Sequence, residues 1–394
     1  QPARGYVRSV RGGDVLADAP GPIYALLSLG GPRRAGFNQG PTLFPYNILA
    51  PADDVGAVGL EGTDLASPTA GLQHLPHCSK DALIAQSLLV WRHDQMRGLP
   101  LFLVRSETDS SADLTALANG RAYANFLVAL DSLLAASAAL GKRPKVLAVG
   151  IDFSLEDQTG DPAAIAQGVR ALMSKIERDM AQRALQRPFF LLTAEAGTQK
   201  VTAHPSILAH WELAWSHGGH AFAIPAPGYM FAQTAFGRPT DAARLRMAEM
   251  DAHAISALSQ RQSWQCPMFL LAEFTGDVIR VTAQSMRDLV IDDHFGSGAG
   301  CGFTVQGTTG PVEVLSVAVA SDDPRALILT CDRTPEGDHA VLCYAYGATT
   351  PSADAYPANR GALRDDWSAP SRAAGSDLHR WALPAALPLR RGAI

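Results

Sequence analysis

Short apolar runs alternate with longer segments of helical spacing over the first two thirds of the chain, and this pattern constrains the fold most strongly. The runs have the length of buried strands: Ile23–Leu29, Leu101–Val104, Lys145–Ile151, Phe189–Thr193 and Ala221–Ile224. The helical segments are Ala82–Met96, Ala122–Leu140, Ala163–Leu185 and Asp241–Leu258. Strands that alternate with helices form a mostly parallel sheet covered on both faces. The sequence therefore predicts a flavodoxin-like α/β domain over residues 23–262.

The pattern changes after Trp264 to short β-branched or aromatic runs separated by turn residues. These runs are Phe269–Phe274, Val278–Ala283, Val312–Ala320, Ala326–Cys331 and Ala340–Tyr346. Such a pattern is typical of an antiparallel β-sandwich, which we expect over residues 263–394. We expect the tail beyond Thr349 to be loop-like, with Trp367 and Trp381 as anchors.

Composition excludes several classes of protein. The 394 residues are 47% hydrophobic and 18% charged, with a formal charge of −5. This balance fits a globular protein of two domains rather than a disordered one. It also disfavours nucleic acid as a partner, because phosphate binding relies on clustered Lys and Arg. No run reaches the roughly 18 apolar residues of a membrane span. Residues 1–22 read as an arm or linker, and the start at Gln1 indicates a processed or incomplete product.

Five cysteines lie far apart, without a Cys-x-x-Cys pair: Cys78, Cys266, Cys301, Cys331 and Cys343. We expect buried free thiols; one disulfide among the last four is the alternative.

Ligands in open α/β sheets sit beyond the carboxyl ends of the strands, so the loop after the first strand is the first place to look for a site. This loop runs from Ser28 through Gly30-Gly31-Pro32-Arg33-Arg34 to Gly40. A phosphate loop would need free backbone N–H groups and a following helix. Pro32 removes one N–H group and Gly40-Pro41 opposes the helix, so the loop does not fit a nucleotide.

Several stretches together resemble the SGNH-hydrolase superfamily, specifically the carbohydrate-esterase-like modules of phage and gene-transfer-agent-type particles. They are Leu29–Gly36, Val104–Gly120, Gly141-Lys142 with Val146–Asp157, Phe189–Thr193, Pro239–Met250, Gly361–Asp365 and Leu378–Trp381. The resemblance implies an SGNH-type α/β domain with an attached β-domain, and a serine esterase site after the first strand.

The residues that carry chemistry in that family are replaced here. Pro32 aligns with the serine nucleophile, and Arg238 aligns with the catalytic histidine. Proline has no nucleophile, and arginine stays protonated and cannot act as a general base. The stretch Ser106–Ser111 lacks the family's oxyanion glycine, and Ser154–Asp157 preserves its acidic block only in part. The resemblance thus implies a pseudoenzyme without catalytic residues.

Other residues offer weak substitutes. Ser28 lies inside the predicted strand, and His217 and His220 read as solvated loop residues at the amino end of a strand. We predict no metal site and no cofactor. Trp211 and Trp215 lie four apart on one helix face and are expected in the core. The ligand-binding candidates are Arg33, Arg34, Asn38 and Arg238, because guanidinium groups at the mouth of the cleft can hold a sugar carboxylate or a phosphate.

Two functions follow from the resemblance. The first is a non-catalytic spike, fibre or baseplate component of an extracellular, virion-like particle. Its expected partners are cell-surface polysaccharide and other particle structural proteins, and it is expected to be a homo-oligomer. The second is an active carbohydrate O-acetylesterase whose nucleophile lies elsewhere than at residue 32.

Overall fold

The computed structural model describes residues 18–31, 33–53, 55–60, 67–109, 113–152, 161–193, 197–216, 218–347, 352–373 and 375–392. The predicted arm therefore lies mostly outside the described residues, as does Pro32.

A mixed eight-stranded sheet forms the centre of the first region, and its order is β10-β9-β8-β1-β7-β3-β5, with β4 also paired to β7. Its strands are β1 (Ile23–Gly30), β3 (Ile48–Pro51), β4 (Val58–Gly59), β5 (Leu72–His74), β7 (Leu101–Thr108), β8 (Pro144–Asp152), β9 (Phe189–Leu192) and β10 (Phe222–Ala223). All pairs are parallel except β3 with β5. A small ribbon pairs β2 (Phe37–Gln39) with β6 (His77–Ser79). The predicted, mostly parallel sheet is confirmed.

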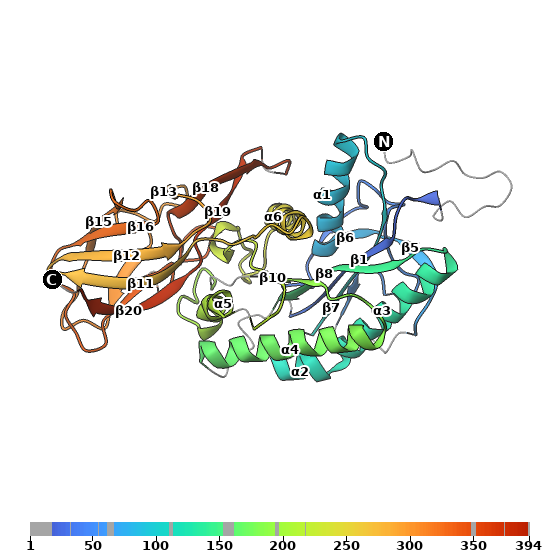
Figure 1. The fold of residues 1–394 in the computed structure, drawn as a ribbon, viewed down its shortest axis with the longest axis horizontal. Helices are drawn as coiled ribbons and strands as arrows, with labels where there is room; N and C mark the ends of the chain where they lie inside the picture. The colour runs from blue at the N-terminus through green and yellow to red at the C-terminus, as the bar shows by residue number, and fades with distance from the viewer. Residues whose placement is uncertain are drawn as a thin grey trace.

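Helices cover both faces of this sheet (Figure 1). One face packs on α1 (Lys80–Asp94) and α6 (Asp241–Ser259). The other packs on α2 (Leu114–Asn119), α3 (Arg121–Ala139), α4 (Pro162–Gln182) and α5 (Pro205–Trp215). The four predicted helices correspond to α1, α3, α4 and α6. Asp161 accepts a hydrogen bond from Ala164 N at the start of α4, with Pro162 in the first turn, as the sequence predicts.

Alternation along β1 decides which side chain meets which layer. Leu26 belongs to the core under α1 and α6, whereas Ile23, Ala25, Leu27 and Leu29 belong to the core under α3 and α4. Ser28 lies two residues after Leu26 on the strand, so it points to the same face of the sheet, toward α1.

One helix, α3, is long and apolar enough by composition to cross a membrane. However, 56% of its most apolar 18-residue stretch is buried in the structure. Its residues Phe126, Leu130 and Leu133 pack in the core against the sheet. It is therefore a core helix of this domain.

The C-terminal region consists of two further sheets. Seven strands have the order β14-β17-β20-β11-β12-β16-β15, and β13, β18 and β19 form a three-stranded sheet. The strands are β11 (Met268–Thr275), β12 (Val278–Gln284), β13 (Leu289–Ile291), β14 (Phe303–Gln306), β15 (Val314–Val319), β16 (Ala326–Cys331), β17 (Val341–Tyr344), β18 (Leu363–Pro370), β19 (Asp377–Trp381) and β20 (Ala385–Arg391). All pairs are antiparallel except β11 with β20. A β-rich region is thus confirmed, while the sandwich arrangement and the domain limits stay predictions.

The prediction of a loop-like tail is wrong, because β18, β19 and β20 all lie beyond residue 349. Pro370, Pro384 and Pro388 interrupt the pattern there, so the sequence shows no clear alternation. Pairing with strands distant in sequence, such as β20 with β11 and β17, supplies the order instead. Trp381 is buried as expected.

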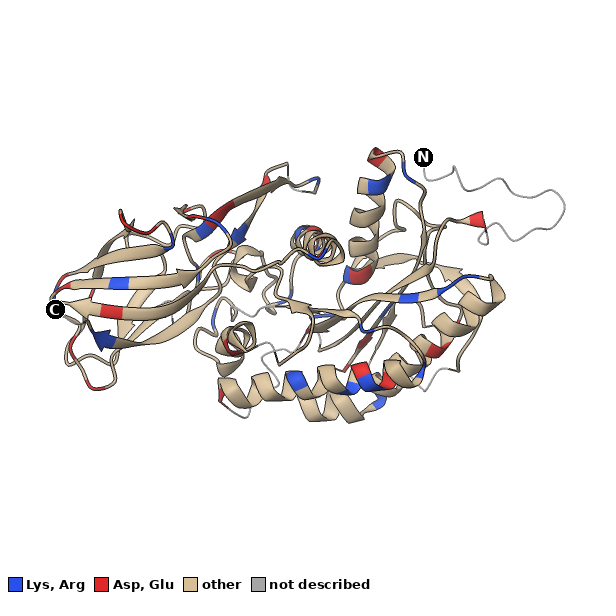
Figure 2. Ribbon diagram, in the orientation of Figure 1, with Lys and Arg blue, Asp and Glu red and all other residues tan. Residues whose placement is uncertain are grey.

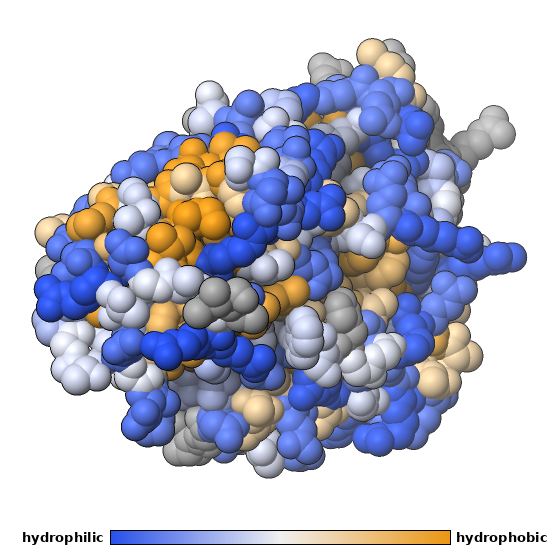
Figure 3. All heavy atoms as spheres, turned by 60° about the vertical axis from the view of Figure 1, so that its left-hand side comes forward, coloured by the Kyte–Doolittle hydropathy of each residue, from blue (hydrophilic) through white to orange (hydrophobic). Residues whose placement is uncertain are grey.

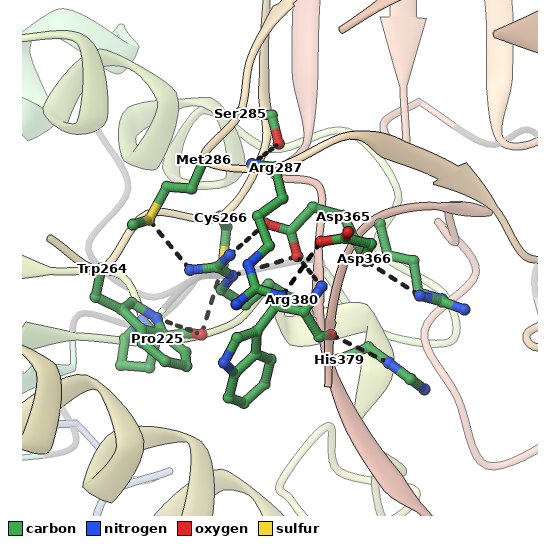
Figure 4. Close-up of polar contacts among 12 residues, drawn as sticks. Pro225, Trp264, Cys266, Ser285, Met286, Arg287, Asp365, Asp366, His379 and Arg380 are labelled. Atoms are coloured by element: carbon green, nitrogen blue, oxygen red, sulfur yellow. Dashed lines mark hydrogen bonds and ion pairs between the residues drawn. The ribbon is translucent and has the colours of Figure 1, made fainter. Parts of the chain in front are cut away.

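The β-rich region shares its core with the layer of α1 and α6. A buried ion pair joins Arg380 and Asp365 at 2.6 Å, and the Arg380 guanidinium lies 5.3 Å and 5.5 Å from the ring centres of Trp264 and Trp367. Trp264 in turn donates to the backbone oxygen of Pro225 at 3.1 Å (Figure 4). This cluster ties the parallel-sheet region to the β-rich one.

We predict that Asp365→Ala destabilises the protein by about 3–5 kcal/mol, because it leaves the Arg380 charge buried and unpaired. Its neighbour Asp366 pairs with Arg287 at 3.4 Å, and both side chains are about half exposed. Asp366→Ala is therefore the matched control and should cost less than about 1 kcal/mol. Urea unfolding of the three proteins checks this; equal losses for the two variants would contradict it.

Candidate functional site

The carboxyl ends of β1, β7, β8 and β9 meet at one edge of the sheet, where a ligand site of this fold is expected. The chain leaves β1 through Gly30 and Gly31, which run close to the end of β8. A Cβ atom at Gly30 would lie 2.7 Å from the backbone oxygen of Asp152, so only glycine fits. Gly31 N donates to the same oxygen at 3.2 Å.

A buried network of four polar side chains occupies the α1 face of this edge. Ser28 and Ser106 are partners in the register of β1 and β7, and Asp81 lies in the first turn of α1. The Ser28 and Ser106 hydroxyls donate to Asp81 Oδ2 at 2.6 Å and 2.5 Å. Arg34 donates from Nε to Ser28 Oγ at 2.9 Å and pairs through Nη2 with Asp81 Oδ1 at 2.5 Å. None of the four is more than 2% exposed.

This network explains why Ser28 is a poor nucleophile. Its hydroxyl is sealed from solvent and contacts a carboxylate, not an imidazole. The Asp81 carboxylate is already paired with a guanidinium, and such a group is a far weaker base than the imidazole that activates a catalytic serine. The prediction that Ser28 lies inside the strand is confirmed, since β1 continues to Gly30.

Two serine–histidine contacts occur elsewhere in the described residues. His204 caps the start of α5, and its Nδ1 lies 2.9 Å from the Oγ atom of the fully buried Ser206. His220 Nε2 lies 3.3 Å from Ser174 Oγ, and its Nδ1 lies 3.1 Å from Glu177 Oε1. The prediction of a solvated loop is thus wrong for His220, whose side chain is only 8% exposed. His220 precedes β10 and so belongs to the amino edge of the sheet.

All five cysteines are free and buried, as predicted. Burial raises the pKa of the Cys78 and Cys301 thiols, and that of Cys343 to about 11. These thiols therefore stay protonated at neutral pH and are weak nucleophiles. In the described part of the chain no group of three or more His, Cys, Asp or Glu residues could hold a metal ion.

The structure separates the four predicted ligand-binding residues. Arg33 is half-buried, and a Cβ atom built on Gly237 would lie 3.8 Å from its Nη2 atom. Gly237 is followed in the chain by the exposed Arg238. Arg34 is buried in the serine network and does not face the mouth of the cleft. Asn38 donates to the backbone oxygen of Asp241 at 3.1 Å and accepts from Arg244, so its amide fixes the start of α6. The structure thus brings Arg33 close to Gly237, the residue that precedes Arg238 in the chain.

Sequence analysis missed three acidic residues at this edge: Asp81, Asp152 and Glu107. Asp152 directly follows the predicted strand Lys145–Ile151, so the rule that polar residues at strand ends form the site would have found it. Burial raises the pKa of Asp152, and the positive charges of Arg34, Arg33 and Lys80 oppose that shift.

Lys80 and Asp251 form a second buried ion pair beside Asp152, with Nζ and Oδ2 2.7 Å apart. Lys80 also donates to Thr193 Oγ1 at 3.3 Å. The cavity that these three residues line measures about 10 Å³, about enough for one water molecule. Ion pairs therefore fill this part of the edge.

Glu107 points to the opposite face of the sheet, toward α3. It lies 3.4 Å from Arg105 Nη1, which belongs to a guanidinium also paired with Asp53, and it hydrogen-bonds to Asn125. Burial raises the pKa of Glu107 to about 7 against the attraction of Arg105, and the charge of Asp53 adds to the rise. A Cβ atom at Gly59 would lie 1.9 Å from Glu107 Oε2, so a larger residue there would have to displace this carboxylate.

Comparison with solved structures identifies a similar enzyme. A carbohydrate acetylesterase from Xanthomonas citri matches at a TM-score of 0.53 and 14% identity, over 87% of this chain and 81% of that one. The chain has the fold of that enzyme. At this identity the likeness establishes the fold alone.

Two further structures cover 60% of this chain at lower scores. A protein from Arabidopsis thaliana has a TM-score of 0.42 at 10% identity, and the aryl esterase of M. smegmatis has 0.31 at 12%. They span 98% and 99% of their own lengths. No known protein family and no curated protein matches the chain.

We predict that Glu107 makes stability depend on pH. Its carboxyl is protonated in the folded protein up to about pH 7 but ionises in the unfolded chain near 4.5. The contribution of Glu107 to the free energy of unfolding is therefore largest below pH 4.5. It falls by about 3 kcal/mol as the pH rises to about 7. Glu107→Gln should remove that part of the fall.

Urea unfolding between pH 4.5 and 8 measures the effect. Asp152 contributes a slope of the same sign, so the test is the difference between wild type and Glu107→Gln. The exposed Glu336, paired with Arg391, provides the control variant Glu336→Gln. Parallel curves for wild type and Glu107→Gln would disprove the assignment.

Proposed function

We propose that the chain is a non-catalytic, carbohydrate-binding module with an acetylesterase fold. One observation carries this proposal: the serine at the end of β1 is locked between Arg34 and Asp81, away from any solvent-exposed cleft. An acyl transfer needs an accessible hydroxyl in contact with a base. The described residues at this end of β1 supply a hydrogen-bonded structural serine instead.

The residues that remain at the surface of this edge favour binding of an acidic saccharide. Arg33 is half-buried and Arg238 is exposed, and both stand near Gly237. A planar guanidinium holds a carboxylate or a phosphate through paired hydrogen bonds. Two such groups at the carboxyl edge of the sheet fit the acidic units of a cell-surface polysaccharide.

An exposed aromatic surface also supports the carbohydrate class. The rings of Trp211 and Trp215 lie parallel, with centres 6.0 Å apart, and Trp215 is 57% exposed. The prediction that both belong to the core is therefore wrong for Trp215, since α5 ends at the surface there. A flat exposed indole suits the apolar face of a sugar ring.

The proposed setting is an extracellular, phage-like particle, in which the chain serves as a spike, fibre or baseplate component. This part rests on the sequence resemblance to esterase-like modules of such particles, including those of the gene-transfer-agent type. We propose that the chain contacts other particle proteins and forms a homo-oligomer. The β-rich region, proposed as a sandwich, would provide the contacts within the particle.

Apolar side chains support oligomer contacts through the β-rich region. Figure 3 shows them gathered on one face of the molecule, over the part where β15 and β16 lie. Strand β15 ends the seven-stranded sheet, and its Leu315 is 49% exposed. Large exposed apolar patches typically mark protein contacts. By contrast, basic and acidic residues are interspersed over the whole ribbon (Figure 2).

We expect multivalent beads that carry the protein to bind acidic capsular polysaccharide, since particle proteins act through avidity. The double variant Arg33→Ala, Arg238→Ala should bind at least about tenfold more weakly, because each lost hydrogen-bonded charge contact is worth roughly 1.5–3 kcal/mol. Arg325→Ala, an exposed arginine of the β-rich region, is the control. Binding that none of these changes affects would argue against the site.

Acetate release from acetylated polysaccharide and from p-nitrophenyl acetate tests the absence of catalysis. Wild type, Ser28→Ala and Ser174→Ala should all equal the protein-free rate. Ser28 contacts a carboxylate rather than an imidazole, and Ser174, which contacts His220, lies at the amino edge of the sheet, away from the edge where a ligand of this fold is expected. Activity that a single Ser→Ala change abolishes would establish the alternative, an active O-acetylesterase.

We expect the protein to form homo-oligomers that Leu315→Asp weakens, since a charge buried in an apolar contact is strongly unfavourable. Light scattering after size-exclusion chromatography measures the mass. Ser316→Asp, an adjacent exposed position on β15, is the control for the added charge. A monomeric wild type would refute the proposal of self-association.

A further inference from the structure

A second cavity opens at the amino edge of the parallel sheet, opposite to Arg33 and Arg238. It lies between α1 and α6 at the beginnings of β1, β7 and β8, and its volume is about 430 Å³. This volume falls within the roughly 300–1,000 Å³ of small-molecule sites. The lining residues are Tyr24, Leu88, Trp91, Arg92, Gln95, Arg97, Pro100, Phe102, Lys145, Leu147, Ile255, Ser256, Ser259 and Gln260.

The lining carries three positive charges, from Arg92, Arg97 and Lys145, and none of its described residues is acidic. Arg92 lies in the last turn of α1 and donates to the backbone oxygen of Gly98 at 2.9 Å, so it balances the partial negative charge of the helix end. Arg97 and Lys145 are exposed, and the described residues offer neither of them an ion pair. Two cations are therefore left to attract an anion.

Aromatic and neutral polar groups complete the lining. Tyr24 and Trp91 are half-buried, and Tyr24 stacks on Phe102 with ring centres 5.5 Å apart. Lys145 Nζ lies 5.8 Å from the centre of the Tyr24 ring, so an aromatic surface and a positive charge adjoin each other. Gln95, Ser256, Ser259 and Gln260 add amide and hydroxyl groups from the ends of α1 and α6.

We propose that this cavity is a second binding site, which takes a saccharide unit bearing a carboxylate, such as a hexuronate. The carboxylate pairs with Arg97 and Lys145, the apolar face of the sugar ring packs on the aromatic groups, and the neutral polar side chains bond to the hydroxyls. A simple aromatic acid would satisfy the cations and rings but would leave the amides and hydroxyls unused.

The saccharide class rests on the function proposed above, but the site itself does not, because it shares no residue with the Arg33–Arg238 edge. Two such sites at opposite ends of one sheet would let a module hold two units of an acidic polymer and gain avidity. Failure at one site is therefore distinguishable from failure at the other.

Ligand-observed NMR titration with methyl β-D-glucuronide, methyl β-D-glucoside and benzoate tests the proposal. The glucuronide should bind the wild-type protein at least about tenfold more tightly than the glucoside, since a hydrogen bond to a charged group contributes roughly 1.5–3 kcal/mol. Arg97→Ala and Lys145→Ala should each weaken glucuronide binding by about the same factor. Lys145→Arg should keep it, and raised salt should weaken it.

Arg143→Ala is the matched control, because it removes an exposed cation two residues from Lys145 that does not line the cavity. Unchanged binding by this variant supports a specific site, whereas an equal loss would reduce the effect to general attraction. Equal binding of glucuronide and glucoside, tighter binding of benzoate than of glucuronide, or no binding of glucuronide would each overturn the proposal. Loss of binding in Arg33→Ala, Arg238→Ala but not in Arg97→Ala would place the saccharide at the carboxyl edge alone.

Discussion

Burying the charges of Arg34 and Asp81 requires that their polar atoms find partners, because an unpaired ion away from water costs several kcal/mol. Ser28 and Ser106 are among those partners. Both hydroxyls donate to one carboxylate oxygen, and the Arg34 guanidinium closes the ring from the other side. Ser28 is thus part of the packing between the sheet and α1. The same requirement explains the Lys80–Asp251 pair, which fills the neighbouring space.

This arrangement depends on how β1 is shared between two cores. Leu27 and Leu29 point to one face of the sheet and pack against α3 and α4. Leu26 and Ser28 face α1, so the polar network lies at the border of the core that continues into the β-rich region. That core joins the two regions through Trp264, Arg380 and Asp365. On this face the buried polar network and the apolar core thus form one continuous layer.

The esterase fold leaves charged groups at both ends of its sheet. At the carboxyl end Arg33 approaches Gly237, the residue before the exposed Arg238, and at the amino end Arg97 and Lys145 border an aromatic cavity. Positive charge on a concave surface favours acidic ligands. The proposed binding of an acidic polysaccharide at more than one site would account for both sets of residues.

The sequence by itself determined the parallel sheet and its four main helices, because strand and helix periodicities are local and Asp161-Pro162 marks a helix start directly. It also determined the absence of a nucleophile at residue 32 and the positive charge of Arg33 and Arg238. It could not place Arg34, since a surface arginine and one buried against Asp81 look the same in sequence. The sequence did not predict strands β18 to β20, because they form through pairing with distant partners and are interrupted by proline. Only the tertiary structure decided that Ser28 meets Asp81, fifty-three residues away in the chain, because long-range contacts depend on strand register and helix packing, which no local pattern records.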